Sequence, residues 1–200
     1  MPDREKESWA VKNVERVKVW DPLVRVFHWT ILLAFATAAL TEFDLLKLHV
    51  FAGYGIGALV IIRVIWGFAG KGAARFDSFV RHPADAIAHL RDMARLRHKR
   101  YLGHNPAAGM MIVALLVSLC ATVLTGLLTH GAKEIAGPFA NLLIEAGWRW
   151  GGALEDSHHA FAALTLILGG LHVAGAALES FIHRENLVVS MITGYKRKND

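Results

Sequence analysis

Four long apolar blocks alternate with polar segments along the chain. The blocks run from about Leu23 to Thr41, Leu48 to Ala69, Pro106 to Leu128 and His158 to Phe181. As a helix, each block of about 19–24 residues is roughly 30 Å long, which matches the hydrocarbon core of a bilayer. The pattern predicts an all-α fold, an integral membrane four-helix bundle. We expect residues 1–200 to form one domain.

The polar segments differ in charge, and this difference predicts the orientation of the bundle. Most Lys and Arg residues lie in the N-terminal segment, in the linker 70–105 and in the C-terminal tail, whereas the two other linkers hold only Lys47, Lys133 and Arg149. Basic segments beside membrane helices usually stay in the cytoplasm. Both termini and the linker 70–105 are therefore expected in the cytoplasm, and the linker 130–156 on the opposite side.

Composition supports a membrane protein rather than a nucleic-acid-binding one. The hydrophobic fraction is 54% and the mean hydropathy is +0.36, whereas about 45–50% apolar residues are usual in soluble domains. The net charge of +5 would suit a nucleic acid, but the basic residues flank the apolar blocks, as in proteins whose partner is membrane lipid. The charged N-terminus lacks an early apolar stretch, so no cleavable signal peptide is expected.

Histidines are the candidate functional residues, because the chain has 11 of them. Ionisable side chains are costly within a membrane and are usually functional there. Those in or beside the apolar blocks are His28, His49, His158, His159 and His172. His130, at the outer end of the third block, is ambiguous. Solvated surface positions are expected for the histidines of the cytoplasmic segments, His82, His89, His98, His104 and His183.

Helical periodicity places His158 and His172 on one face of the fourth helix. The 14 residues between them turn the helix by about 1400°, roughly 40° short of four turns, and separate them by about 21 Å along the axis. His159 lies about 140° from His172. His158 is therefore the better partner on the inward face, and the spacing indicates two separate sites near opposite membrane surfaces.

Depth in the membrane predicts the partners of these two histidines. His28 begins the first helix from the cytoplasmic side, and His49 begins the second helix from the other side. Matching depths pairs His28 with His172 and His49 with His158. Two imidazoles per centre suit the axial ligands of a low-spin haem iron, whereas zinc usually adds Cys or carboxylate ligands.

Other residues limit and extend the haem hypothesis. Cys120 is the single cysteine and no CxxCH motif is present, so covalent attachment is excluded and the haem is expected to be non-covalent. Arg63, within the second block, and Arg25, one turn before His28, need anionic partners or must reach the membrane surface. A haem propionate and a lipid phosphate are equally suitable partners.

These residues form a set of motifs that resembles the bacterial cytochrome b561 family over about residues 17–197. That family includes quinone-linked superoxide oxidases and is related to the b-type cytochrome subunits of nickel–iron hydrogenases. The matching elements are Trp-Asp-Pro-Leu-Val-Arg-Val-Phe-His-Trp (20–29), His49 with Gly53-Tyr54, Arg-Val-Ile-Trp-Gly-Phe (63–68), Gly-His-Asn-Pro (103–106), the His158/His172 pair, and Glu185-Asn186-Leu187 with Thr193-Gly194. Many relatives have an acidic residue where this chain has His159.

The resemblance implies a cytochrome b561-like domain in the cytoplasmic (inner) membrane of a bacterium, with residues 130–156 in the periplasm. It implies two b haems, with His28, His49, His158 and His172 as axial ligands of the iron. It also implies that the protein exchanges electrons with a quinone pool.

Three functions remain open at this stage. The first is a carrier between the quinone pool and a periplasmic donor or acceptor, such as a c-type cytochrome or another redox protein. The second is an oxidoreductase that passes electrons from superoxide to quinone without a protein partner. The third, of a different class, is a membrane anchor or metal-ion transporter without haem. The sequence does not decide whether the protein is an enzyme or an electron-transfer protein.

Overall fold

The computed structural model describes residues 15–198 except residues 43, 96, 98 and 145–146. The long helices are α1 (Pro22–Thr41), α2 (Leu46–Ala69), α5 (Pro106–Lys133) and α7 (Gly147–Ile182). All four are long and apolar enough to cross a membrane. The short elements are β1 (Arg16–Lys18), η1 (Gly72–Ala74), α3 (Phe76–Phe79), α4 (Pro83–Ala94), α6 (Ala140–Leu143), α8 (Leu187–Thr193) and β2 (Tyr195–Arg197). The all-α membrane bundle expected from the apolar pattern is confirmed.

Two of the long helices begin at a capping residue followed by proline. The Asp21 side chain accepts a hydrogen bond from the Leu23 backbone N–H at 2.8 Å, with Pro22 as the first helical residue. The Asn105 side chain accepts one from the Ala108 backbone N–H at 2.7 Å, ahead of Pro106. A capping oxygen satisfies a free N–H of the first turn, and proline has no N–H to satisfy. The sequence therefore fixes where α1 and α5 begin.

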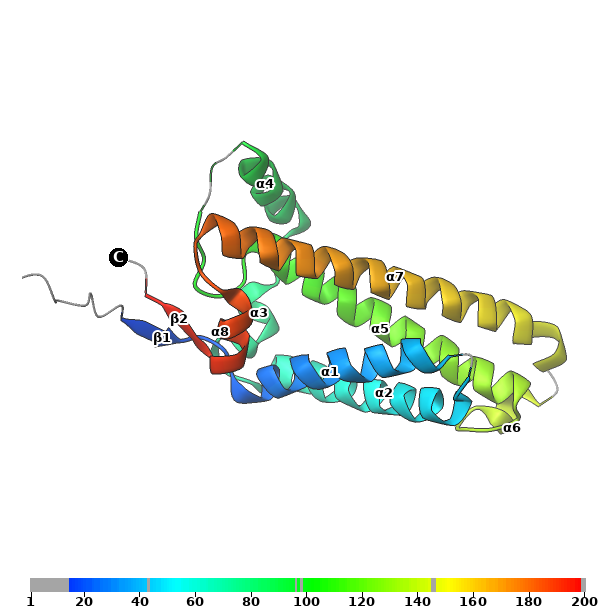
Figure 1. The fold of residues 1–200 in the computed structure, drawn as a ribbon. Coiled ribbons are helices and arrows are strands. Elements are labelled where there is room, and N and C mark those ends of the chain that lie inside the picture. The colour runs from blue at the N-terminus through cyan, green and yellow to red at the C-terminus, as the bar shows by residue number, and fades with distance from the viewer. Residues whose placement is uncertain (1–14, 43, 96, 98, 145–146, 199–200) are drawn as a thin grey trace, which may run out of the picture.

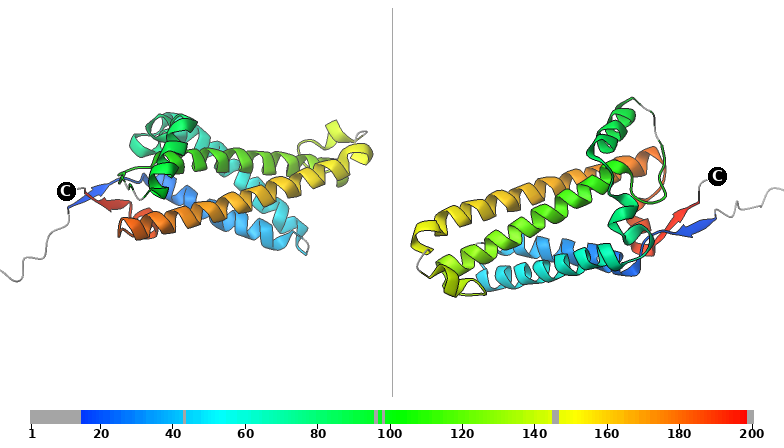
Figure 2. Two further views of the ribbon diagram at one scale, coloured as in Figure 1. Left: turned by 90° about the horizontal axis from the view of Figure 1, so that it is seen from above. Right: turned by 180° about the vertical axis from the view of Figure 1, so that it is seen from behind.

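The four long helices form two pairs, α1 with α2 and α5 with α7, which α2 and α5 join (Figures 1 and 2). The buried apolar core between α1, α2 and α5 consists of Ala38, Ala52, Ile56, Val60 and Leu119. Large apolar side chains on the outer surface, such as Phe51, Phe68 and Phe181, are mostly exposed. An outward apolar surface of this kind is suited to lipid.

Hydroxyl groups hold α5 against α7 in the middle of the bundle. Thr165 Oγ1 lies 2.7 Å from Ser118 Oγ and 3.1 Å from Thr122 Oγ1, and all three side chains are buried. Polar contacts of this kind between membrane helices replace water that the bilayer does not supply. They fix the register between the two helices.

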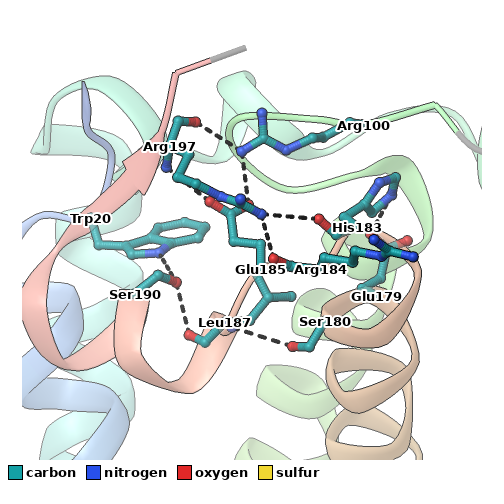
Figure 3. Close-up of polar contacts among 10 residues, drawn as sticks. All are labelled: Trp20, Arg100, Glu179, Ser180, His183, Arg184, Glu185, Leu187, Ser190 and Arg197. Carbon is teal, nitrogen blue, oxygen red and sulfur yellow. Dashed lines mark hydrogen bonds and ion pairs between the residues drawn. The ribbon is translucent and has the colours of Figure 1, made fainter. Parts of the chain in front are cut away.

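Both described ends of the chain lie at one end of the bundle, which we call the termini end (Figure 1). There β1 pairs antiparallel with β2, with Val17 opposite Lys196. The Trp20 indole N–H donates to Ser190 Oγ at 3.2 Å (Figure 3). Gly194 ends α8 with a φ of +90°, a left-handed conformation that favours glycine. We call the opposite end, with the connections α1–α2 and α5–α7, the far end.

At the far end, two of the long helices extend beyond the expected apolar blocks. α5 continues to Lys133 rather than ending near Leu128, and α7 begins at Gly147 rather than near His158. The apolar pattern marks only the part of a helix that suits lipid. Residues 147–157 contain no proline, so the backbone hydrogen bonds can continue through this more polar stretch. The segment 130–156, expected as a linker, is therefore partly helical.

Candidate functional site

α1 and α7 each contribute one histidine to a pair in the half of the bundle near the termini end. The ring centres of His28 and His172 are 6.3 Å apart, and the ring planes make an angle of 53°. We call these residues the termini-end pair. Both side chains are partly buried, and the His28 ring also meets the edge of the Trp29 ring, with ring centres 5.2 Å apart.

A second pair lies towards the far end, between α2 and α7. The ring centres of His49 and His158 are 5.9 Å apart, with the planes nearly perpendicular at 87°. We call these residues the far-end pair. The structure thus brings together the same two pairs of rings that the sequence analysis predicted from depth in the membrane. Their role as iron ligands stays a prediction.

The ring separations fit a metal ion between two imidazoles. A metal–nitrogen bond of about 2.0 Å and a distance of about 1.1 Å from nitrogen to ring centre put two opposed rings about 6.2 Å apart. The observed separations of 6.3 and 5.9 Å are close to this value. Among the described residues, no group of three or more His, Cys, Asp or Glu side chains could hold a metal ion. Each pair alone could therefore supply two ligands to a metal ion, and a haem ring would supply the rest.

Backbone carbonyl groups orient both rings of the far-end pair. His49 Nδ1 lies 2.9 Å from the Ala38 carbonyl oxygen, and His158 Nδ1 lies 2.9 Å from the Thr122 carbonyl oxygen. A carbonyl oxygen only accepts, so Nδ1 must carry the proton and donate it. The lone pair is then on Nε2, as metal-binding histidines require.

Gly126 makes room for the His158 ring, a role that the sequence analysis did not assign. A Cβ atom at this position would lie 2.9 Å from Cε1 and 3.0 Å from Nδ1 of His158. Gly126 stands four residues after Thr122, one turn along α5. The same stretch of α5 thus supplies both the space for the ring and the acceptor for its N–H.

A cavity of about 460 Å³ surrounds the far-end pair. Its walls are mainly apolar, and they include Phe35, Val50, Leu127, Ala162 and Leu166. Cofactor sites usually measure about 300–1,000 Å³ and are mostly apolar with a few placed polar groups. The cavity therefore fits a large, flat apolar cofactor held by His49 and His158.

His159 lines the same cavity, with its ring centre 6.2 Å from that of His158, but it has a different polar partner from the far-end pair. Its Nε2 is 3.1 Å from Glu42 Oε1, and its side chain is half exposed. The neighbouring His158 faces His49 instead. This arrangement agrees with the helical periodicity, which placed His158 on the inward face.

Unpartnered nitrogen atoms of two arginines lie in the termini-end half of the bundle. Arg63 is 3% exposed, its guanidinium lies 5.1 Å from the centre of the Phe76 ring, and one terminal nitrogen has no hydrogen-bond partner. Arg25 donates to the Ile192 carbonyl, but its Nε is buried and unpartnered. Buried donors normally have acceptors. An anionic group such as a haem propionate fits these two guanidinium groups.

Among the histidines expected on the solvated surface, His89 is buried, and His104 and His183 are partly buried, so that expectation was wrong for these three. His89 on α4 is 7% exposed, and Nδ1 of His104 is buried without a partner. Burial, with smaller effects of the positive charges of Lys196 and Arg63, lowers the pKa of His104 to about 3. For His89 and His104, the reason is the fold of the segment 70–105, which packs α4 against α5. His98 lies outside the described residues.

Comparisons with known proteins agree with this site. Residues 19–194 match the family model described as prokaryotic cytochrome b561. Three relatives are each described as a probable Ni/Fe-hydrogenase B-type cytochrome subunit. The protein from Cupriavidus necator is 26% identical over 94% of this chain and 90% of its own length. Those from Rhizobium leguminosarum bv. viciae and Rhodobacter capsulatus are 23% and 22% identical, over 97% and 96% of this chain and 95% and 85% of theirs.

No solved structure matches the chain at a significant level. The family match nevertheless covers α1, α2, α5 and α7, with both histidine pairs. The chain therefore belongs to the prokaryotic cytochrome b561 family and is a b-type membrane cytochrome that serves in electron transfer.

Proposed function

We propose that this protein carries electrons across the membrane through two b haems. His28 and His172 would hold one haem, and His49 and His158 the other. The observation that carries the proposal is the pair of facing imidazoles in each half of one membrane bundle. The two histidines of α7 are about 21 Å apart along the helix axis, and two haem rings would reach towards each other across part of that distance.

Each haem would supply a one-electron iron centre, and the chain's own residues would position it. The Ala38 and Thr122 carbonyls keep Nε2 of His49 and His158 free to bind iron. Arg25 and Arg63 would neutralise propionates at the termini end. The apolar walls of the far-end cavity exclude water, which helps to set the reduction potential of a haem.

We place the termini end in the cytoplasm of a bacterium and the far end in the periplasm, because the basic segments gather at the termini end. The electron partners would be the membrane quinone pool and a redox protein. The three relatives are described as Ni/Fe-hydrogenase subunits, which favours a protein partner. Exposed apolar side chains at the far end, Ile135, Leu142 and Trp150, supply a surface for that partner.

The alternative functions receive less support. A site for superoxide needs a basic rim that attracts anions. Of the three basic residues expected at the far end, Lys133 is paired with Glu155 at 2.7 Å, which reduces its attraction for an anion. A metal-ion transporter needs clusters of ligands, and the described residues contain no group of three or more candidate metal ligands.

Haem quantitation on purified protein tests the proposal. We expect two b haems per chain by pyridine haemochrome and by reduced-minus-oxidised spectra. His172→Ala should remove the termini-end haem, and His158→Ala the far-end haem, each leaving the other in place. His159→Ala is the matched control and should retain both. A protein without haem, after expression with ample haem supply, would contradict the proposal.

A further inference from the structure

A carboxylate lies in the last turns of α7, on the face that carries His172. Glu179 stands seven residues after His172, which is about 20° short of two turns and about 10 Å along the axis. The residue belongs to the apolar span Arg149–Ile182, and its side chain is 18% exposed. An ionisable group in a membrane helix is costly and is usually functional.

Three side chains from different segments surround this carboxylate. The Asn105 amide, in front of α5, donates to Oε1 at 3.0 Å. His89 Nε2, on α4, is 3.8 Å from Oε1, and His183 Nε2 is 3.4 Å from Oε2. We call these four residues the Glu179 cluster. Figure 3 shows Glu179 and His183 beside the ion pair of Arg100 with Glu185.

Nε2 of His89 is a ring nitrogen that can accept a proton. Its side chain is 6% exposed, and Nε2 is buried without a hydrogen-bond partner. A proton on this nitrogen would face the Glu179 carboxylate and pair with its negative charge. The neutral imidazole has one ring nitrogen that accepts a proton, and in His89 the unpartnered Nε2 can serve as that acceptor.

Other charged and titratable groups around the cluster have contacts of their own. Tyr101 lies with its ring centre 5.5 Å from that of His89, and the Lys99 ammonium is 5.6 Å from the Tyr101 ring centre. The Lys196 ammonium lies 5.3 Å from the Trp20 ring centre, and its charge interacts with Glu179. Arg197 donates to the His183 and Arg184 carbonyls. The Glu179 carboxylate thus faces both histidines directly.

We infer that the Glu179 cluster binds a proton when the centre at His28 and His172 is reduced and releases it on reoxidation. His28 and His172 would hold the haem iron, which would take up one electron passed on by the far-end centre. One proton enters from the aqueous phase at the termini end and binds to His89 Nε2 opposite Glu179, so the charge of the region stays constant. The reason is electrostatic, because His172 and Glu179 are about 10 Å apart along the α7 axis, and an added negative charge nearby in a low-dielectric region attracts a proton.

The cluster has a route to water. The His183 side chain is 14% exposed and that of Glu179 is 18% exposed, at the end of α7 that meets the segment 183–198. A proton can therefore reach the carboxylate from the termini end without crossing the bundle. The inference rests on the proposed function, since only a redox centre at His28 and His172 supplies the electron.

A structural role is the competing explanation, because Glu179 also ties α4 and Asn105 to α7. Glu179→Gln separates the two roles. Glutamine keeps an oxygen that accepts from Asn105, but it removes the negative charge that a proton on His89 needs. Glu179→Asp retains that charge and is the conservative variant. Glu155→Gln, on the same helix at the far end, is the matched control.

The test is a redox titration of both haems in purified protein over a range of pH. We expect the midpoint potential of the termini-end haem to fall as the pH rises. This dependence should be lost in Glu179→Gln and His89→Gln and retained in Glu179→Asp and Glu155→Gln. The redox-difference infrared spectrum gives an independent readout, since histidine bands that change on reduction should vanish in His89→Gln.

An unchanged pH dependence in Glu179→Gln and His89→Gln would overturn the inference. If Glu179→Gln does not fold, the pH dependence of the termini-end midpoint potential in His89→Gln decides alone whether the inference holds. Failure of the proposed function is distinguishable, because wild-type protein would then lack a termini-end haem in the haem count, before any titration.

Discussion

Gly126→Ala gives the sharpest test of how the protein positions the far-end pair. The added Cβ would lie 2.9 Å from Cε1 of the His158 ring, and ordinary contact begins at 3.4 Å. The difference of 3.4 minus 2.9 Å means that the ring must shift by about 0.5 Å. An imidazole is rigid, and its Nδ1–H is bound to the Thr122 carbonyl at 2.9 Å, so the ring cannot move without weakening that hydrogen bond.

The expected cost follows from these two effects. Overpacking in a filled interior costs about 1–3 kcal/mol, and a weakened hydrogen bond costs up to about 1 kcal/mol. A combined loss of about 1–4 kcal/mol from haem binding raises the dissociation constant of the far-end haem roughly 5–900-fold. The termini-end haem should be unaffected, because Gly126 contacts neither His28 nor His172.

The assay is haem occupancy of each site, together with the electron paramagnetic resonance signal and midpoint potential of the far-end haem. Gly55→Ala is the matched control, since Gly55 lies on α2, is exposed and has nothing within 4 Å of its Cβ position. If Gly126→Ala keeps two haems with an unaltered far-end signal and potential, the positioning argument is wrong.

Three further predictions concern other parts of the molecule. Arg63→Gln should raise the dissociation constant of the termini-end haem about 5–150-fold, because a charged hydrogen bond worth about 1–3 kcal/mol is lost. Titration of the protein with haemin measures the occupancy of this site and checks the prediction. Thr165→Val should lower the free energy of unfolding by about 0.6 kcal/mol for each interhelical hydrogen bond that is lost. The melting temperature should fall, while both haems remain bound. For Glu185, burial raises the pKa, but hydrogen bonds from the Arg197 backbone and the Arg100 guanidinium prevail, so the pKa is lowered. Because the pKa of Glu185 is lower in the folded than in the unfolded protein, the ionised carboxylate stabilises the fold at pH values above its unfolded-state pKa. This stabilisation is lost as the pH falls through the folded-state pKa. Unfolding measured from neutral pH to below about 4 should therefore show an acid-dependent loss that Glu185→Gln abolishes.

The sequence by itself determined the helices and the faces they share. Apolar blocks long enough for a bilayer gave four spans, and two helix starts depend on local caps, Asp21 before Pro22 and Asn105 before Pro106. Helical periodicity put His158 and His172 on one face. These features are local, because they depend on neighbours within a few turns of the same helix.

Only the tertiary structure decided which distant groups meet. Gly126 has no side chain to signal a role, and it matters only because α5 packs against α7 at the level of His158. His89 lies in a charged segment, yet α4 folds back onto α5 and brings it to Glu179, 90 residues later in the chain. The space left for a ring and the burial of a histidine depend on contacts between helices, and the pattern along one helix does not contain that information.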